Sequence, residues 1–433
     1  MKAKLMSLMM LAAMMTFAGP LDKAVLHGEA NRADFLAYAP NEEMTFTLTL
    51  QRAQPFKPGT YFVQWTCAGD GGEVQQGKVP LSPTEPVIVK TRRAQPGFVH
   101  LVAKVVDAKG TLCLRVGKGS EEVRGIMFDG GAGVEPEKLQ SLPEPPDFDA
   151  FWAARRARLA KVPMKPVVKE HPSKNPKVRV LSFTVPCAGP RPVTGTVTVP
   201  RDTSRKYPAH ITFHGYGAKF VQTIPKSGPE NEIFMFINAH GYELEREPEY
   251  YTEFYNALKS NDKTFALDSF WQNKSTDTAY FGTMIYRIMR ALEYLKSFPE
   301  WNGKDLIASG GSMGGLQTIW AAGIDKDVSL AQPSIPWCCD VGGRDTLKRM
   351  RLSHQIAETA ALRYFDPVNF AKRIAPTCRV EVTRAGLGDY VSPPSGVSIF
   401  YNNVRGPKKI TWVQGSSHGY VPQEKHQVLV REK

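Results

Sequence analysis

The ten residues from Ala308 to Gln317 read ASGGSMGGLQ, and they lie between the segments WNGKDLI and TIWAAG. Residues 310–314 fit the pattern G-x-S-x-G with Ser312 at its centre. A nucleophile at a sharp strand-to-helix turn needs strained backbone dihedrals, and glycine neighbours let such a turn close. A phosphate-binding loop would need a lysine before the serine, and a flexible connector would not be flanked by regular structure. The segment therefore predicts that Ser312 is a nucleophile.

The sequence around this turn alternates between strands and helices. Apolar strands that continue without a polar face, separated by amphipathic helices, are typical of a mostly parallel sheet flanked by helices. We therefore expect an α/β fold of the α/β-hydrolase type. The expected strands cover residues 177–186, 192–200, 208–217, 232–241 and 305–311, and the expected helices cover 148–162, 278–298 and the residues from Met313 onward.

A serine hydroxyl needs a general base and a carboxylate that orients the base. In this architecture they follow the serine in the order Asp or Glu, then His. Asp389 follows the apolar segment RVEV, and His418 follows KKITWV, so both are expected in loops at the carboxyl ends of strands. His354 falls on a predicted helix and His426 lies near the chain terminus, so they are weaker alternatives to His418. The sequence predicts a triad of Ser312, Asp389 and His418.

An oxyanion hole needs two backbone amides. One is expected to be the N–H of Met313, which directly follows the nucleophile. The other is expected from the segment FHGYGA, through the N–H of Tyr216, with Gly215 and Gly217 allowing a tight loop.

Residues 19–134 have a different pattern. Short alternating strands with regular Gly and Pro punctuation predict a small all-β, immunoglobulin-like sandwich. The segment FDGGAGVEPEKLQSLPEPPDFDAFW follows, and its Gly, Pro and Glu content is that of a linker. We place the domain boundary within it, so that residues 135–433 form the catalytic domain.

The first 18 residues resemble a cleaved secretory signal. Lys2 and Lys4 precede an apolar run over residues 5–15, and a small residue suited to cleavage stands at Ala18. The run is shorter than a membrane span, and no later segment is long and apolar enough to cross a bilayer. We expect an exported protein, secreted or periplasmic, with no stable membrane insertion.

Charge and cysteine content add weaker indications. The net charge of +13 suggests an acidic partner such as a glycan that carries uronic acids, and no dense basic run of the nucleic-acid-binding kind is present. Six cysteines in an exported chain permit disulfides, and Cys67–Cys113 is the favoured pair because both lie in expected strands of the same region. No spacing suggests a metal or cofactor site.

From about residue 147 to the C-terminus, the chain resembles the acetyl xylan esterase and cephalosporin C deacetylase family of α/β-hydrolases. The resemblance is carried by DFDAFW, FHGYGA, GGSMGG, SIPWCCD, YFDPVNFAKRIAPTC, GLGDYVSPPSG, YNNVRGPKKI and SSHG. It implies deacetylation of carbohydrate esters by Ser312, Asp389 and His418 without a metal. The family's closed oligomer leaves a homo-oligomer open for this chain.

The chain departs from the family pattern at three places. Met313 stands where the family has Gln, residues 240–242 read HGY where it has Arg-Gly-Gln, and Gly419 replaces a Glu. These changes alter residues that would surround the triad and set the substrate preference. Trp337 aligns with a segment beside the nucleophile and is expected to line the pocket. His240, in place of the family Arg, and Trp271, in a polar loop, are further candidates for substrate contact.

The expected function is that of a secreted serine esterase that removes O-acetyl groups from xylan or xylo-oligosaccharides. One alternative is a feruloyl or glucuronoyl-type esterase, because the basic charge and the altered motifs would suit bulkier or acidic substrates. A second, from another class, is a non-catalytic glycan-binding protein that retains the hydrolase shell.

Overall fold

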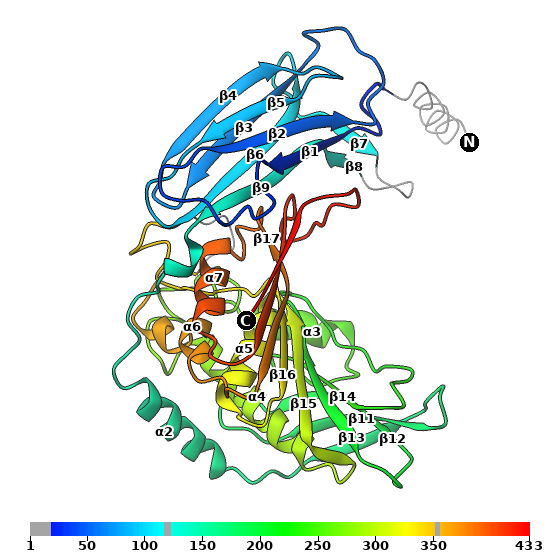
Figure 1. The fold of residues 1–433 in the computed structure, drawn as a ribbon. Coiled ribbons are helices and arrows are strands. Elements are labelled where there is room, and N and C mark those ends of the chain that lie inside the picture. Colours follow the sequence, from blue (N-terminus) through cyan, green and yellow to red (C-terminus); the bar gives the residue numbers. More distant parts are fainter. Residues whose placement is uncertain (1–18, 117–122, 351–355) are drawn as a thin grey trace, which may run out of the picture.

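A computed structural model describes residues 19–116, 123–350 and 356–433. The expected signal segment, residues 1–18, and the alternative base His354 lie outside the described residues. Figure 1 shows an all-β part above a larger part in which helices flank a twisted sheet.

The N-terminal part consists of antiparallel strands in two sheets. One sheet has the order β1-β2-β5 and the other β4-β3-β6-β9, while β7 and β8 form a separate hairpin. Alternation decides which side chains face inward: along β2, Met44, Phe46 and Leu48 are buried between half-buried threonines. The strands are β1 (Val25–Ala30), β2 (Met44–Gln51), β3 (Tyr61–Gly69), β4 (Val74–Pro80), β5 (Val87–Thr91), β6 (Gly97–Asp107), β7 (Leu114–Val116), β8 (Val123–Gly125) and β9 (Met127–Val134).

The expected disulfide between Cys67 and Cys113 is wrong, because both are free thiols. Cys67 pairs with Leu101 of β6, whereas the Cys113 N–H bonds the carbonyl of Val105, four residues further along the same strand. Four residues span about 13 Å at about 3.3 Å per residue. A disulfide requires Cα atoms less than about 7 Å apart.

The linker-like segment also differs from expectation. Its first residues, FDGGAGV, form most of β9, which pairs with β6 in the sandwich. The short 3-10 helix η2 (Pro136–Lys138) follows. The glycines serve close packing here, because a Cβ on Gly131 would lie 2.1 Å from the Val99 carbonyl oxygen.

The larger part contains a ten-stranded sheet with the order β10-β11-β12-β14-β13-β15-β16-β17-β18-β19. Strands β14, β13, β15, β16, β17 and β18 pair in parallel. Strands β10, β11, β12 and β19 pair antiparallel, so the sheet is mostly parallel. The strands are β10 (Val167–His171), β11 (Val178–Val185), β12 (Val193–Pro200), β13 (Tyr207–Phe213), β14 (Ile233–Ile237), β15 (Trp301–Gly311), β16 (Leu330–Ser334), β17 (Arg379–Gly386), β18 (Lys408–Val413) and β19 (Val428–Glu432).

Helices cover this sheet. The helices α4, α5, α6 and α7 contact one another in sequence and form one layer, with α2 packed outside α4. Helix α5 is buried along nearly its whole length, because it begins directly after β15 and packs against β13, β15 and β16. The helices are α2 (Phe148–Ala160), α3 (Pro248–Ala257), α4 (Tyr280–Lys296), α5 (Met313–Ile324), α6 (Pro367–Ala371) and α7 (Pro394–Asn403), with the 3-10 helix η3 (Ala361–Tyr364) before α6.

The two parts meet at the end of the sheet nearest β17 and β18 (Figure 1). The buried amide of Gln414 accepts the Gly131 N–H at 2.9 Å and donates to the Gly131 carbonyl at 2.8 Å. Phe98 of β6 packs on Trp412 of β18 with ring centroids 5.6 Å apart. The contact is therefore built of core-like packing and of hydrogen bonds to the free edge of β9.

Candidate active site

Ser312 occupies a strained turn between β15 and α5. Its φ of 58° and ψ of −118° lie outside the regions that a non-glycine residue normally adopts. A Cβ on Gly314 would lie 2.3 Å from the Phe213 carbonyl oxygen, and one on Gly310 would lie 2.6 Å from the Gly314 backbone. The glycines of the motif are thus required by close backbone approach, and the turn carries the serine hydroxyl at the carboxyl edge of the sheet.

The three residues expected as a triad lie together. His418 Nε2 is 2.8 Å from Ser312 Oγ, and His418 Nδ1 is 2.9 Å from Asp389 Oδ2. With the Nδ1 proton donated to the carboxylate, Nε2 is free to accept the serine proton. The arrangement can therefore activate the hydroxyl and hold the imidazolium that would result.

The carboxylate and the histidine are held by their own loops. Asp389 is fully buried, and its Oδ1 accepts the N–H groups of Val391 at 3.1 Å and Ser392 at 2.8 Å. The Arg384 guanidinium donates to the His418 carbonyl at 3.1 Å, which fixes the histidine loop from β17. The orienting groups are thus fixed by hydrogen bonds before any substrate binds.

The two amides predicted for the oxyanion hole belong to residues near the serine, since Met313 follows it in the chain and Tyr216 follows Gly215. The Gly215 Cα lies beside the turn, since a Cβ built on it would be 3.9 Å from Ser312 Cβ. Within the described residues, neither Tyr216 N–H nor Met313 N–H donates a hydrogen bond to a protein acceptor. Unpaired amides beside a nucleophile and at the start of helix α5 suit a developing oxyanion.

A cavity of about 270 Å³ opens over the serine. Among the residues predicted from the sequence, Tyr216, Trp337 and His418 line it together with Ser312. The Tyr216 ring stacks on Phe265 at 4.4 Å, and the Trp337 ring meets it edge-on at 5.5 Å. The remaining wall is apolar, from Leu267 and Val391.

His240 does not reach this cavity, so its predicted substrate contact is wrong. It is fully buried, and Nδ1 bonds the Tyr280 hydroxyl at 2.9 Å. Aromatic rings enclose it, with Phe265 at 4.4 Å and Tyr255 at 5.5 Å. Burial holds the pKa of His240 well below its ordinary value, and the neighbouring His214 lowers it further.

Trp271 is 55% exposed and does not line the cavity over the serine. Its ring meets the exposed Phe270 edge-on at 4.7 Å. Both follow the cavity-lining Leu267 in the chain, and their N–H groups bond the carboxylate of Asp268. The pair forms an exposed aromatic surface on the same loop as part of the cavity wall.

His214 was not singled out by the sequence analysis, although it begins the HGYG segment. Nδ1 donates to the Gly215 carbonyl at 2.7 Å, and Nε2 accepts the Ala239 N–H at 3.1 Å. Its ring stacks on Phe220 at 4.2 Å. It therefore holds in place the loop that carries Tyr216, one of the two predicted oxyanion donors.

The sandwich supports the aspartate loop, which the sequence analysis also missed. His100 of β6 stacks on Tyr390, the neighbour of Asp389, with ring centroids 3.9 Å apart. His100 Nε2 in turn bonds Asp129 at 2.5 Å. A Cβ on Gly388 would lie 2.2 Å from the Asp129 carbonyl oxygen, so the loop and β9 touch. No sequence signal pairs positions so far apart.

The described part of the chain contains neither a metal-binding cluster nor a membrane-spanning helix. No cluster of three or more His, Cys, Asp or Glu side chains there could hold a metal ion. None of its helices has the length and apolarity needed to cross a membrane.

A model of the acetyl xylan esterase family matches residues 138–431, about two thirds of the chain. The chain belongs to this family. The predicted resemblance is confirmed, and the protein is a carboxylic ester hydrolase. An acetyl esterase of Xylanibacter ruminicola, Axe7A, is 28% identical over 352 residues, which cover 77% of this chain and 73% of that protein. That match covers more of this chain than residues 138–431, which the family model matches.

Two solved acetyl xylan esterases have a similar fold. The enzyme from Paenibacillus sp. R4 is 21% identical, with a TM-score of 0.52 over 66% of this chain and 93% of that one. Acetyl xylan esterase 1 of Thermoanaerobacterium sp. is also 21% identical, with a TM-score of 0.52 and coverage of 66% and 92%. The predicted α/β-hydrolase fold of this acetyl xylan esterase family member is confirmed.

Proposed function

We propose that this family member is an exported serine esterase that removes O-acetyl groups from xylan or xylo-oligosaccharides, using Ser312, His418 and Asp389. The observation that carries the proposal is the hydrogen-bonded chain from serine to histidine to buried carboxylate at the base of a small cavity. The export rests on the signal-like residues 1–18 alone.

The geometry supports a two-step acyl transfer. His418 takes the proton of Ser312, whose oxygen attacks the ester carbonyl, and the Tyr216 and Met313 amides bind the oxyanion. The C–O bond to the sugar then breaks, and the sugar hydroxyl leaves with the proton from His418. Water repeats these steps on the acetyl-enzyme and releases acetate. Asp389 keeps the Nδ1 proton in place and stabilises the imidazolium throughout.

The size of the cavity supports a small acyl group. Its volume of about 270 Å³ includes the space above the serine, and it is smaller than the pockets of about 300–1,000 Å³ that enclose drug-sized ligands. Leu267, Trp337 and Val391 give the apolar wall that an acetyl methyl group would contact.

The sugar would lie outside this cavity, on the side of the Phe270–Trp271 surface. Exposed aromatic faces bind the apolar faces of pyranose rings, while the hydroxyls stay in water. Both rings are more than half exposed, at 62% and 55%. This surface would position the glycan while the acetyl group enters the cavity.

The proposal is tested by acetate release from acetylated xylo-oligosaccharides and 4-nitrophenyl acetate, with methyl ferulate for comparison. Wild type should release acetate, and Ser312→Ala should reduce turnover by about 10⁴-fold or more. Ser204→Ala, on an exposed turn, is the matched serine control. Acetate release that persists in Ser312→Ala would overturn the mechanism, and turnover of ferulate without acetate would overturn the substrate assignment.

A further inference from the structure

The Phe270–Trp271 surface keeps two large rings in water on a loop that is otherwise closely hydrogen-bonded. Both rings are more than half exposed, and they meet edge-on, so each leaves a face uncovered by the other. Neighbouring apolar side chains in water carry a hydration cost, and an exposed apolar patch commonly marks a binding surface. The loop around the two rings shows how this exposure is maintained.

The carboxylate of Asp268 fixes the backbone at the two rings. Its side chain is 2% exposed, and Oδ1 accepts the N–H groups of Phe270 at 2.9 Å and Trp271 at 3.2 Å. Oδ2 accepts the Ser260 hydroxyl at 2.6 Å. These three donors are neutral groups, so an amide side chain at position 268 could accept the same two N–H groups. The role of Asp268 is therefore to accept hydrogen bonds that set the course of the chain.

Two amide side chains close the rest of the loop. The Gln272 side chain accepts the Ala266 N–H at 2.8 Å and donates to the Leu258 carbonyl at 3.0 Å. The fully buried Asn273 side chain donates to the Ala266 carbonyl at 2.7 Å, and the Thr359 hydroxyl donates to the Asn273 carbonyl at 2.7 Å. The loop is thus fixed by its own bonds, and a ligand on the two rings would not have to order it.

The same loop forms part of the catalytic cavity. Leu267, the residue before Asp268, lines the cavity over Ser312. Phe265 stacks on the Tyr216 ring at 4.4 Å and accepts the Tyr216 hydroxyl at its carbonyl at 3.1 Å. From residue 267 to residue 271 the chain extends at most about 14 Å. The exposed rings therefore lie within reach of a short oligosaccharide whose acetyl group occupies the cavity.

We propose that Asp268 is a positioning residue that holds Phe270 and Trp271 as a binding surface for the sugars next to the acetylated one. The enzyme then prefers glycan chains to an acetylated monosaccharide, because only a chain reaches both the cavity and the surface. The apolar faces of the sugar rings contact the aromatic rings, and their hydroxyls stay in water. The inference rests on the proposed function in that a glycan carries the acetyl group, and it adds the preference for chain length.

The first test is acetate release by the full-length protein from substrates of increasing length. The substrates are 4-nitrophenyl acetate, an acetylated methyl xyloside and an acetylated xylo-oligosaccharide. For wild type, KM should be at least about tenfold lower for the oligosaccharide than for the xyloside, with similar kcat, because the contact is made equally in the ground state and the transition state.

Variants of the loop assign this preference. Trp271→Ala, Phe270→Ala and Asp268→Ala should each raise KM for the oligosaccharide by about three- to tenfold and leave turnover of 4-nitrophenyl acetate within about twofold of wild type. Asp268→Asn should keep the low KM, because its amide oxygen still accepts both N–H groups. The rings are exposed, so their variants test the surface even if the melting temperature shows that Asp268→Ala does not fold.

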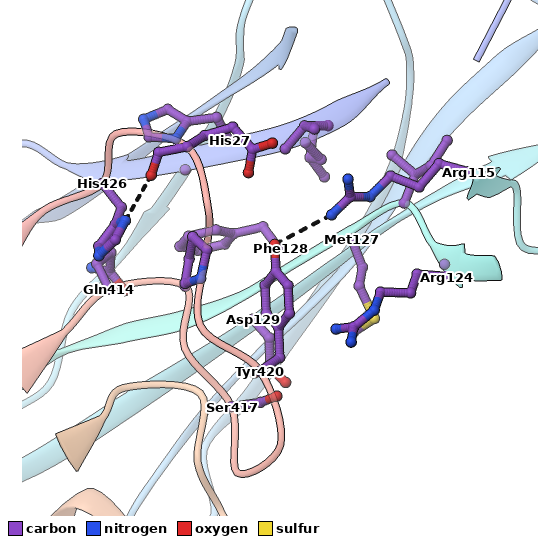
Figure 2. A pocket seen from close by; sticks show the side chains of 18 of the residues that line it. His27, Arg115, Arg124, Met127, Phe128, Asp129, Gln414, Ser417, Tyr420 and His426 are labelled. Atoms are coloured by element: carbon purple, nitrogen blue, oxygen red, sulfur yellow. Dashed lines mark hydrogen bonds between the residues drawn. The ribbon is translucent and has the colours of Figure 1, made fainter. Parts of the chain in front are cut away.

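Met127→Ala is the control for another location of the glycan. Met127 lines a cavity of about 410 Å³ between the sandwich and the loop that carries His418, and its side chain is partly exposed (Figure 2). This variant should keep the preference for the oligosaccharide. A preference that is lost in Met127→Ala and kept in Trp271→Ala would place the glycan in that cavity and overturn the proposal.

Binding without turnover separates this inference from the proposed function. In calorimetry, an unacetylated xylo-oligosaccharide should bind wild type at least about tenfold more tightly than it binds Trp271→Ala, whether or not wild type releases acetate. Equal binding to the two proteins, or a KM that neither ring variant changes, would overturn the inference. A ring variant that lowers the molecular mass in light scattering would also overturn it, because the surface would then be a contact between copies of this chain.

Discussion

His214 and His240 place two imidazoles in the core beneath the oxyanion loop. Their ring centroids are 5.2 Å apart, and both are buried. Burial lowers the pKa of His214 to about 4, although the Gly215 carbonyl that accepts its proton acts in the opposite direction. Both rings are therefore neutral at neutral pH. A neutral His214 can donate at Nδ1 and accept at Nε2 at once, which the loop requires.

This burial predicts a loss of stability in acid. Between a pKa of about 6.5 in the unfolded chain and about 4 in the folded one, the unfolded state binds more protons at His214, so stability falls as pH falls through that window. The full contribution is up to about 3 kcal/mol. Lowering the pH from 6.5 to 4 should therefore lower the melting temperature of wild type more than that of His214→Phe. The control is His171→Gln, on the edge strand β10, and a difference that is constant with pH would contradict the prediction.

For single residues, the sequence predicts the catalytic side chains but not which polar side chains are buried by packing. Ser312, Asp389 and His418 could be predicted because each follows an apolar strand and because their chain order fits the architecture. His240 could not, because the rings that enclose it come from Tyr255 and Tyr280, and nothing local indicates that they converge. From the sequence alone, a buried histidine in such a segment is indistinguishable from one that is exposed to substrate.

Among the elements, the turn from β15 into α5 combines strain with tight packing. The backbone of Ser312 is strained, and the surrounding contacts hold it there: the Ser312 N–H bonds the Ser334 carbonyl at 2.9 Å, and the Trp337 N–H bonds the Ser312 carbonyl at 3.1 Å. Strain of this kind persists only where the neighbouring structure over-determines the conformation. The turn is therefore sensitive to any atom added on its inner side.

Two glycines of the motif should respond differently to alanine. A Cβ on Gly314 would lie 2.3 Å from the Phe213 carbonyl oxygen, whereas one on Gly311 would meet nothing within 4 Å. We expect Gly314→Ala to lower the free energy of unfolding by about 1–3 kcal/mol and Gly311→Ala to change it by less than about 1 kcal/mol. Thermal and denaturant unfolding measure both. Equal losses in the two variants would show that the close approach at Gly314 does not constrain the turn.

Strand β9 shows where element prediction fails. Its sequence, MFDGGAGV, contains three glycines and reads as a connector. In the structure the same glycines let the strand approach β6 and the Asp389 loop. A Cβ built on Gly131 would lie 3.5 Å from the Leu387 carbonyl oxygen. The helices and buried strands of the catalytic part were predictable because their periodicity is local. A strand that uses glycine for contact with a distant loop has no such local pattern.

In the whole molecule, the sandwich is part of the support of the active site. Tyr390, beside Asp389, stacks on His100 of the sandwich, and Tyr420, beyond His418, is held by Arg115. The Gly388 N–H also bonds the Ser416 carbonyl at 3.0 Å, which ties the two triad loops together. The sequence analysis treated the sandwich as a separate domain, and these contacts depend on positions roughly 300 residues apart that no single-sequence pattern can pair.

Gln414 provides the sharpest test of this coupling. Its fully buried amide satisfies both the N–H and the carbonyl of Gly131 on the free edge of β9. Gln414→Ala would leave both groups buried without partners, at about 1–3 kcal/mol for each. We expect the melting temperature to fall by several degrees and kcat to fall with it, because Gln414 also precedes the loop that carries His418.

The matched control is Gln76→Ala, on the exposed strand β4 at the far edge of the same sheet. It removes the same side chain without removing a buried hydrogen bond, so both melting temperature and kcat should stay close to those of wild type.

Calorimetry adds a readout that a local defect would not change. If the sandwich and the catalytic part unfold as one unit because this interface is core-like, wild type gives one transition and Gln414→Ala broadens or splits it. Two well-separated transitions already present in wild type, with kcat unaffected by Gln414→Ala, would mean that the sandwich is an independent module and that the triad loops do not depend on it.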